Sequence, residues 1–324
     1  MRPRHAPRAG RRERRVNRPH VLVTGGAGFV GGAVLPLLRA AGVRVRVLAH
    51  RRPTERGPDV EVVDGDLTDP SSVRGLCQGV DRVLHLASYV GKDEERCQAV
   101  NVEGTHRLVA EARRAGVTGF VRLGTAAVYG NGPFVRTAEG AEEPRPVSST
   151  SRSRLAGEEP VLAAGGAVLR PYLVYGAGDR WVMPALARML RALPSGLPER
   201  GSARLSLTEV GSLAAALVGT AVHTPPRRAA GVFHACPERP VTLRELVATA
   251  HRELGLPLVR GDQPFERARE ELLAAGCDPH LLDLFGVDHW FDGTRLRTLG
   301  SHPPLTGLAE GLAAHADWYR AHLP

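Results

Sequence analysis

A glycine-rich turn near the amino end constrains this chain more than any other feature. An apolar run leads into Thr24-Gly25-Gly26-Ala27-Gly28-Phe29-Val30-Gly31, and apolar residues with helical spacing follow. Gly25 permits a tight turn off a strand, Gly28 lets backbone approach a pyrophosphate, and Gly31 lets a helix pack against the strand. The first N–H groups of that helix then point at the phosphates. The turn therefore predicts a dinucleotide site that includes Gly25, Gly28, Phe29 and Val30.

The next 150 residues alternate between apolar strand-like runs and helical patterns. Strands are expected at residues 21–24, 43–49, 60–63, 80–87, 117–123 and 167–174. Helices are expected at residues 30–41, 70–77, 96–115 and 151–164. Such alternation with right-handed crossovers predicts an α/β fold, a doubly wound Rossmann-type parallel sheet. Sites in these sheets lie beyond the carboxyl ends of the strands.

The pattern becomes irregular after Gly178. Helices are expected at residues 181–193, 213–222, 243–254 and 265–275, with a short strand at 231–235. We therefore expect a Rossmann domain at 19–180 and a smaller α-rich substrate lobe at 181–324, with 204–235 returning to the Rossmann domain. Residues 1–18, almost without apolar side chains, are expected to be a disordered basic tail.

The distribution of charge argues against a nucleic-acid partner. The net charge is +9, but residues 1–18 hold eight Arg and one Glu, which leaves +2 for the remainder. No apolar run reaches the roughly 18 residues that a membrane span needs. The four cysteines fit neither a metal site nor a disulfide framework. We expect a cytoplasmic protein with no metal and no membrane partner.

The residues after the second expected strand bear on which dinucleotide is used. That strand ends His50-Arg51-Arg52, without the carboxylate that would bind a ribose 2′-hydroxyl. Because arginine binds phosphate in bidentate fashion, the segment favours NADP (as NADPH) over NAD. A merely solvated loop is the alternative. Asp66 and Leu67 are expected beside the adenine, although Asp66 alternatively caps a turn.

Six motifs between residue 19 and about residue 254 belong together: Thr24–Gly31, Asp64–Asp69, His85-Leu86-Ala87-Ser88, Asn101-Val102-Glu103-Gly104-Thr105, Thr125-Ala126-Ala127-Val128-Tyr129-Gly130 and Arg170-Pro171-Tyr172-Leu173-Val174-Tyr175-Gly176. On these motifs the chain resembles the extended short-chain dehydrogenase/reductase family, which includes sugar-nucleotide epimerases, dehydratases and related reductases. The resemblance implies cofactor contacts from Leu86, Ala87, Ser88, Pro171 and Val174.

The family's chemistry uses a Ser or Thr, a Tyr general acid or base, and a Lys four residues after that Tyr. Thr125 matches the first position, whereas the Tyr and Lys positions align with Thr150 and Arg154. Arg154 can still hold ribose hydroxyls, but arginine stays protonated and threonine is a poor proton source. Losing a positioned acid commonly costs on the order of 10²–10⁴ in rate. The chain is therefore either a reductase with another proton source or a protein that has stopped catalysing.

Other groups are candidates for handling the substrate oxygen. Ser149 and Thr150 are placed to hydrogen-bond it, and Tyr89 is an acid or, more simply, a wall residue. Tyr172, Tyr175 and His85 also lie at the active end of the sheet, where packing roles are the simpler interpretation. Water or a phenol of the substrate itself are the remaining proton sources.

Two positions at which the chain differs from sugar-nucleotide members of the family bear on the class of substrate. Sugar-nucleotide members carry an Asn where this chain has Tyr172, and an Arg near the position of Ser202. Both departures disfavour a nucleotide sugar. Six second-lobe residues are candidates for an apolar pocket or for core: Trp181, Met183, Met189, Phe285, Trp290 and Phe291.

The degenerate Tyr/Lys pair and the NADP-type basic residues resemble atypical ketoreductases of aromatic polyketides. They imply an NADPH-dependent reduction of an angucyclinone-like ketone in antibiotic biosynthesis. The alternatives are a nucleotide-sugar epimerase or reductase and a non-catalytic NADP(H) sensor. The expected state is a monomer or a homodimer, since relatives pair the helices at 96–115 and 151–164.

Overall fold

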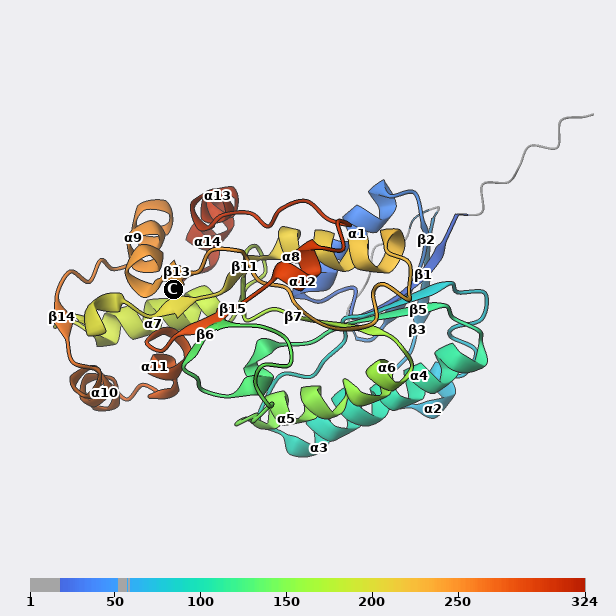
Figure 1. The fold of residues 1–324 in the computed structure, drawn as a ribbon, viewed down its shortest axis with the longest axis horizontal. Coiled ribbons are helices and arrows are strands. Elements are labelled where there is room, and N and C mark those ends of the chain that lie inside the picture. Colours follow the sequence, from blue (N-terminus) through green and yellow to red (C-terminus); the bar gives the residue numbers. More distant parts are fainter. Residues whose placement is uncertain (1–17, 52–56, 58, 324) are drawn as a thin grey trace, which may run out of the picture.

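The computed structural model describes residues 18–51, 57 and 59–323. Most of the expected basic tail, together with Arg52, lies outside the described residues. The large sheet and the helices that cover it form one part of the molecule, and a smaller, mainly helical part adjoins it (Figure 1).

Seven parallel strands form the large sheet, in the order β12-β7-β5-β4-β1-β2-β3. They are β1 (His20–Thr24), β2 (Arg44–Ala49), β3 (Val60–Asp64), β4 (Arg82–His85), β5 (Gly119–Leu123), β7 (Ala167–Arg170) and β12 (Gly231–His234). The strand order reverses beside β1, which pairs with β2 on one side and β4 on the other. The crevice at this reversal is where doubly wound sheets bind ligands. The expected fold class is confirmed.

Helices cover both faces of the sheet, as its nearly continuous apolar strands require. The elements on one face are α1 (Phe29–Ala40), α8 (Val210–Val218), the π-helical segment η4 (Gly219–His223) and α12 (Thr294–Arg297). The other face carries α2 (Pro70–Val73), α3 (Glu94–Cys97), the π-helical segment η1 (Gln98–Glu103), α4 (Gly104–Arg114), α5 (Ser149–Ala156) and α6 (Glu159–Ala163), as Figure 1 shows.

The smaller part is built from helices and short strands. Its helices are α7 (Val182–Ala192), α9 (Leu243–Leu254), α10 (Phe265–Ala274), α11 (His280–Phe285), α13 (Leu308–Ala314) and α14 (Ala316–His322), with the 3-10 turn η3 (Glu199–Gly201). The remaining strands are β6 (Phe134–Thr137), β8 (Leu173–Tyr175), β9 (Leu197–Pro198), β10 (Arg204–Leu205), β11 (Leu207–Glu209), β13 (Val241–Thr242), β14 (Asp262–Gln263) and β15 (His289–Phe291). The 3-10 turn η2 (Ala126–Tyr129) follows β5.

Two expected elements are split, and both splits have a proline beside them. The expected strand at 167–174 is wrong as one element: β7 belongs to the large sheet, whereas β8 pairs with β11. Pro171 lies between them and has no N–H for a sheet hydrogen bond. The expected helix at 151–164 divides at Gly157, where Pro160 lacks the N–H that would bond residue 156.

The six apolar candidates of the second lobe divide between core and surface. Met183, Met189, Phe285 and Phe291 are fully buried, so they are core residues. Trp290 is partly buried beneath the Arg204 guanidinium, and Trp181 is 62% exposed. In the described part of the chain, no helix is long and apolar enough to cross a bilayer.

Candidate cofactor and substrate site

A cleft of about 700 Å³ opens at the carboxyl ends of β1, β2, β3 and β4. Ten residues proposed from the sequence line it: Gly25, Gly28, His50, Arg51, Asp66, Leu67, Leu86, Ala87, Ser88 and Tyr89. They come from four separate segments of the chain. The fold therefore brings most of the sequence-derived cofactor residues to one place.

The glycines of the first turn leave room only for bare backbone. Gly25 has a φ of +73°, and a Cβ there would lie 2.6 Å from the Ala87 nitrogen. A Cβ at Gly31 would lie 2.2 Å from the Gly25 carbonyl oxygen. Gly28 is the N-cap of α1 and makes no side-chain cap, so the first N–H groups of the helix stay available to a ligand. The cradle fits the pyrophosphate of a dinucleotide.

Charged groups meet at the end of β2. The imidazole of His50 lies 3.4 Å from the Asp66 carboxylate, and Arg51 adopts a φ of +48°. Burial raises the pKa of Asp66, but hydrogen bonds from Thr68 and the charges of His50 and Arg51 outweigh burial and lower it. Asp66 accepts a 2.8 Å bond from the Thr68 N–H, so it caps a turn and also lines the cleft.

Asn101 holds the loop after β4 in place. Its amide oxygen accepts from the Tyr89 N–H (2.7 Å), and its amide nitrogen donates to the Tyr89 carbonyl and to Ser153 (2.9 Å each). Asn101 is fully buried in η1, and π-helical segments often occur at functional sites. The sequence motif contains Asn101, but its role as a clamp follows only from the fold.

Tyr89 lines the cleft from the same loop. The Arg96 guanidinium lies 4.5 Å from the centre of its ring. This cation–π contact orients the ring, which folds back over Gly91.

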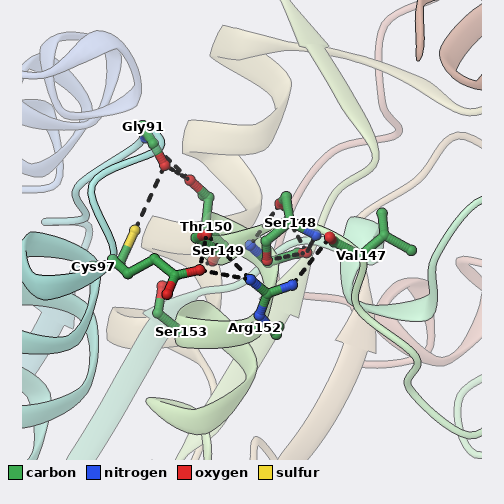
Figure 2. Close-up of polar contacts among 10 residues, drawn as sticks. Gly91, Cys97, Val147, Ser148, Ser149, Thr150, Arg152 and Ser153 are labelled. Carbon is green, nitrogen blue, oxygen red and sulfur yellow. Dashed lines mark hydrogen bonds and ion pairs between the residues drawn. The ribbon is translucent and has the colours of Figure 1, made fainter.

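The hydroxyls proposed to meet a substrate make hydrogen bonds within the protein, and Figure 2 shows those of Ser149 and Thr150. The Thr150 hydroxyl donates to the Gly91 carbonyl (2.9 Å) and accepts from the Gly91 N–H (3.0 Å). Ser149 donates to Glu94 (2.8 Å), which also accepts from Arg152 (3.0 Å). Thr125 caps η2 by accepting from the Ala127 N–H (3.2 Å). The structure thus gives these three residues local structural contacts.

Arg154 points back to the end of β5. Its Nη2 donates to the carbonyls of Leu123 (3.1 Å) and Gly124 (2.8 Å). Its buried Nε has no hydrogen-bond partner among the described residues. The other sequence candidates surround this region without lining the cleft: Val30 is buried in α1, the Pro171 carbonyl accepts from the Ala126 N–H, and Val174 lies in β8.

A second cavity of about 240 Å³ lies between η2, α5 and α11. It is lined by Ala127, Gly130, Asn131, Val147, Ser148, Ser151, Tyr172, His280, Asp283, Leu284 and His289. The rings of Tyr172 and His289 stack at 4.5 Å with an angle of 4°. Asp283 accepts from Asn131 and pairs with His280. Among the described residues that line it there is no Arg or Lys. Sequence reasoning missed the α11 residues, because they lie over 100 residues from η2.

A buried polar chain lies behind this cavity. Arg170 donates to the Tyr129 hydroxyl (2.8 Å), which contacts the Nε2 of His234 (2.8 Å). Burial, with the charge of Arg170, lowers the pKa of His234 to about 4. His234 is therefore neutral in the folded protein at pH 7.

We expect His234 to make stability depend on pH. The unfolded chain protonates this imidazole near 6.5 and the folded protein near 4, so between them the unfolded state binds more protons. The free energy of unfolding should therefore fall as the pH drops from 6.5 toward 4, by on the order of 3 kcal/mol from this group. Urea unfolding of the wild type and of His234→Gln across this range measures the slope. Equal slopes would contradict the assignment.

Residues 21–228 match the model of the NAD dependent epimerase/dehydratase family, so the chain belongs to that family. Its members are NAD(P)-dependent oxidoreductases with a Rossmann sheet, and this agrees with the cleft described above.

Named relatives differ in their substrates. The chain is 28% identical over 326 residues to the 2-alkyl-3-oxoalkanoate reductase of Stenotrophomonas maltophilia, a match covering 90% of this chain and 97% of the relative. It is 27% identical to the 4-hydroxy-2-methyl-3-oxo-4-farnesyl-3,4-dihydroquinoline-1-oxide ketoreductase of Stigmatella aurantiaca, covering 76% and 77% of the two chains. The solved structure of MoeE5 with UDP-glucuronic acid and NAD is 26% identical, with a TM-score of 0.73 over 94% of this chain and 100% of MoeE5.

Other matches are partial. The chain is 31% identical over 229 residues to a 3 beta-hydroxysteroid dehydrogenase/Delta 5-->4-isomerase of Mycobacterium tuberculosis, covering 64% of this chain and 61% of that relative. It spans 43% of the length of the Sinorhizobium fredii protein y4nG.

Proposed function

We propose that the protein is an NADPH-dependent ketoreductase that reduces a ketone on an uncharged, ring-containing substrate of the aromatic polyketide type. The observation that carries the proposal is the contrast between the linings of the two cavities. The cofactor cleft combines a glycine cradle with Arg51 and His50, whereas the second cavity is lined by no Arg or Lys among the described residues. A diphosphate-bearing substrate needs cations that the second cavity does not offer.

Two further observations favour a ketone over a nucleotide sugar. Arg204, two residues from the position where sugar-nucleotide members carry an Arg, donates to Asp288 through its backbone N–H (2.6 Å) and its guanidinium (2.6 Å). Two relatives are named as reductases of oxo compounds.

Separate groups of residues are proposed to bind the cofactor and the substrate. The turn at Gly25 and Gly28 with the start of α1 binds the pyrophosphate, and Arg51 binds the 2′-phosphate. The stacked Tyr172 and His289 help to form the wall against which the substrate packs. When bound, NADPH supplies a hydride to the carbonyl carbon. The oxygen then takes a proton from water or from a phenol of the substrate, because Thr150 is committed to Gly91.

The proposed division of the chain follows the same contacts. We infer that residues 19–180, with 204–235, form most of the cofactor domain and that most of the rest of 181–324 forms the substrate lobe. The exceptions are β6 and β10, which pair within the smaller part, and α12, which packs against the large sheet.

The test is NADPH consumption at 340 nm with a panel of aromatic polyketide ketones, and with UDP- and dTDP-sugars in parallel. We expect turnover of a ketone and none of the sugars. Sugar turnover would establish the epimerase or reductase alternative instead. Cofactor binding without turnover of any ketone would favour a non-catalytic NADP(H) sensor.

Arg51→Asn should change the cofactor preference. Asparagine tolerates the left-handed backbone at this position but cannot bind a phosphate as a cation does. We expect NADPH affinity to fall on the order of tenfold with little change for NADH. Cofactor fluorescence titrations measure both. Arg44→Asn, at the opposite end of β2, is the control and should leave the ratio unchanged. A wild-type protein that prefers NADH would refute the role of Arg51.

A further inference from the structure

Three arginines and one carboxylate are gathered at the carboxyl end of β5. Arg170 and Glu158 form an ion pair at 2.5 Å, and both are almost fully buried. Arg154 reaches the Leu123 and Gly124 carbonyls. Arg122, on β5 itself, is 2% exposed. Charge buried in this way is costly unless it is paired or hydrogen-bonded.

The cluster carries excess positive charge. Arg122 donates to neutral acceptors, the Asn101 carbonyl (3.3 Å), the Thr105 hydroxyl (2.5 Å) and the Gly157 carbonyl (2.7 Å). Burial, and then the charge of Arg154, lowers the pKa of Arg122 to about 10, so it remains protonated at pH 7. Within the described part of the chain, Glu158 is the one carboxylate that pairs inside this cluster.

The neighbouring histidine does not offset this charge. Burial, with the charges of Arg122 and Arg154, lowers the pKa of His85, which is therefore neutral. His85 lies at the end of β4 and contacts Thr24 (2.6 Å) and Thr105 (3.0 Å). The positive charges of Arg122 and Arg154 therefore reach His85 at the end of β4, which lies beside the cleft.

The position of this cluster matters for a bound dinucleotide. In a doubly wound sheet each half binds one mononucleotide across the reversal of strand order. The adenosine half here is β1, β2 and β3, where Arg51 lies, so the nicotinamide half is β4, β5 and β7. Leu123, Gly124, Glu158 and Arg170 belong to or flank that half.

We propose that the buried Arg122 and the partly buried Arg154 together make the site bind the reduced cofactor in preference to the oxidised one. The proposal rests on the proposed function. The nicotinamide ring is neutral when reduced and positively charged when oxidised, so excess positive charge nearby weakens binding of the oxidised form. The repulsion follows Coulomb's law at an effective dielectric constant of about 20, and we expect it to change the binding constant on the order of tenfold. The chain thereby favours reduction and release of the spent cofactor.

The experiment compares dissociation constants for NADPH and NADP⁺ by isothermal titration calorimetry, in the absence of substrate. Wild type should bind NADPH on the order of tenfold more tightly. Arg154→Met removes one charge and keeps the length of the side chain, so the ratio should fall toward one. Arg154→Lys retains the charge and should restore the ratio. A loss of ribose contacts alone would weaken both forms equally and leave the ratio unchanged.

A matched control is Arg152→Met, an exposed arginine on the same helix, which should keep the wild-type ratio. Equal affinity of the wild type for both forms would overturn the proposal, and this measurement does not depend on any variant folding. Failure to bind either form would instead refute the proposed function.

Discussion

Gly31→Ala is expected to reduce NADPH affinity by at least about a hundredfold. The added Cβ would lie 2.2 Å from the Gly25 carbonyl oxygen and 2.6 Å from that of Gly26, and neither backbone group can move without reshaping the turn. Either α1 shifts or the turn opens, which displaces the N–H groups that bind the pyrophosphate. A misplacement of about 1 Å can lower a catalytic rate on the order of 10²-fold, and we expect a loss of at least that size in affinity. Calorimetric titration with NADPH measures the loss.

Gly32→Ala is the matched control for this prediction. The next residue along α1 meets nothing within 4 Å of a Cβ, and alanine is the better helix former by roughly 1 kcal/mol. This variant should therefore bind NADPH normally and melt at the same temperature or higher. Normal binding by Gly31→Ala would show that the turn does not hold the cofactor.

Glu158→Gln is expected to have the largest effect on stability. It removes the partner of Arg170 and leaves a buried guanidinium without a counter-charge, which typically costs about 3–5 kcal/mol. The loss should appear in the free energy of unfolding measured by urea denaturation at pH 7.

The neighbouring Glu159 provides the comparison, because it is exposed in α6. Glu159→Gln should change the free energy of unfolding by no more than about 0.5 kcal/mol. If both variants unfolded alike, the buried ion pair would contribute nothing specific to the fold.

The parallel sheet and the cofactor cleft were predictable because their signals are local. A glycine turn after an apolar strand, and strands alternating with helices, carry the fold within short windows of sequence. The segments that contribute to the cleft could then be placed, since parallel strands end at the same edge of the sheet. The sequence did not predict the breaks near Pro160 and Pro171, the early end of α2 at Val73 or the π-helical segment η1. It also did not predict the elements after residue 275, which begin with α11.

The second cavity and the charge cluster were not predictable in this way. The cavity joins residues near 130, 150, 172 and 285, and no periodicity relates them. Arg122 gave one signal, a charged residue inside an otherwise apolar strand, but the identity of its partners depends on the fold. The role of Asn101 was also not predictable, because its four hydrogen bonds join it to Ser88, Tyr89 and Ser153, which lie in two other segments of the chain.

The hydrogen bonds of Thr150 also bear on how this protein could be altered. Its hydroxyl ties both backbone groups of Gly91 to the first turn of α5, so the position is already occupied by a structural task. A tyrosine at position 150 would lose the two hydrogen bonds to Gly91. The residue four positions later would be Arg154 rather than a lysine. Introducing a Tyr and a Lys at these positions would therefore require coordinated changes in the loop at Gly91, at position 150 and at position 154.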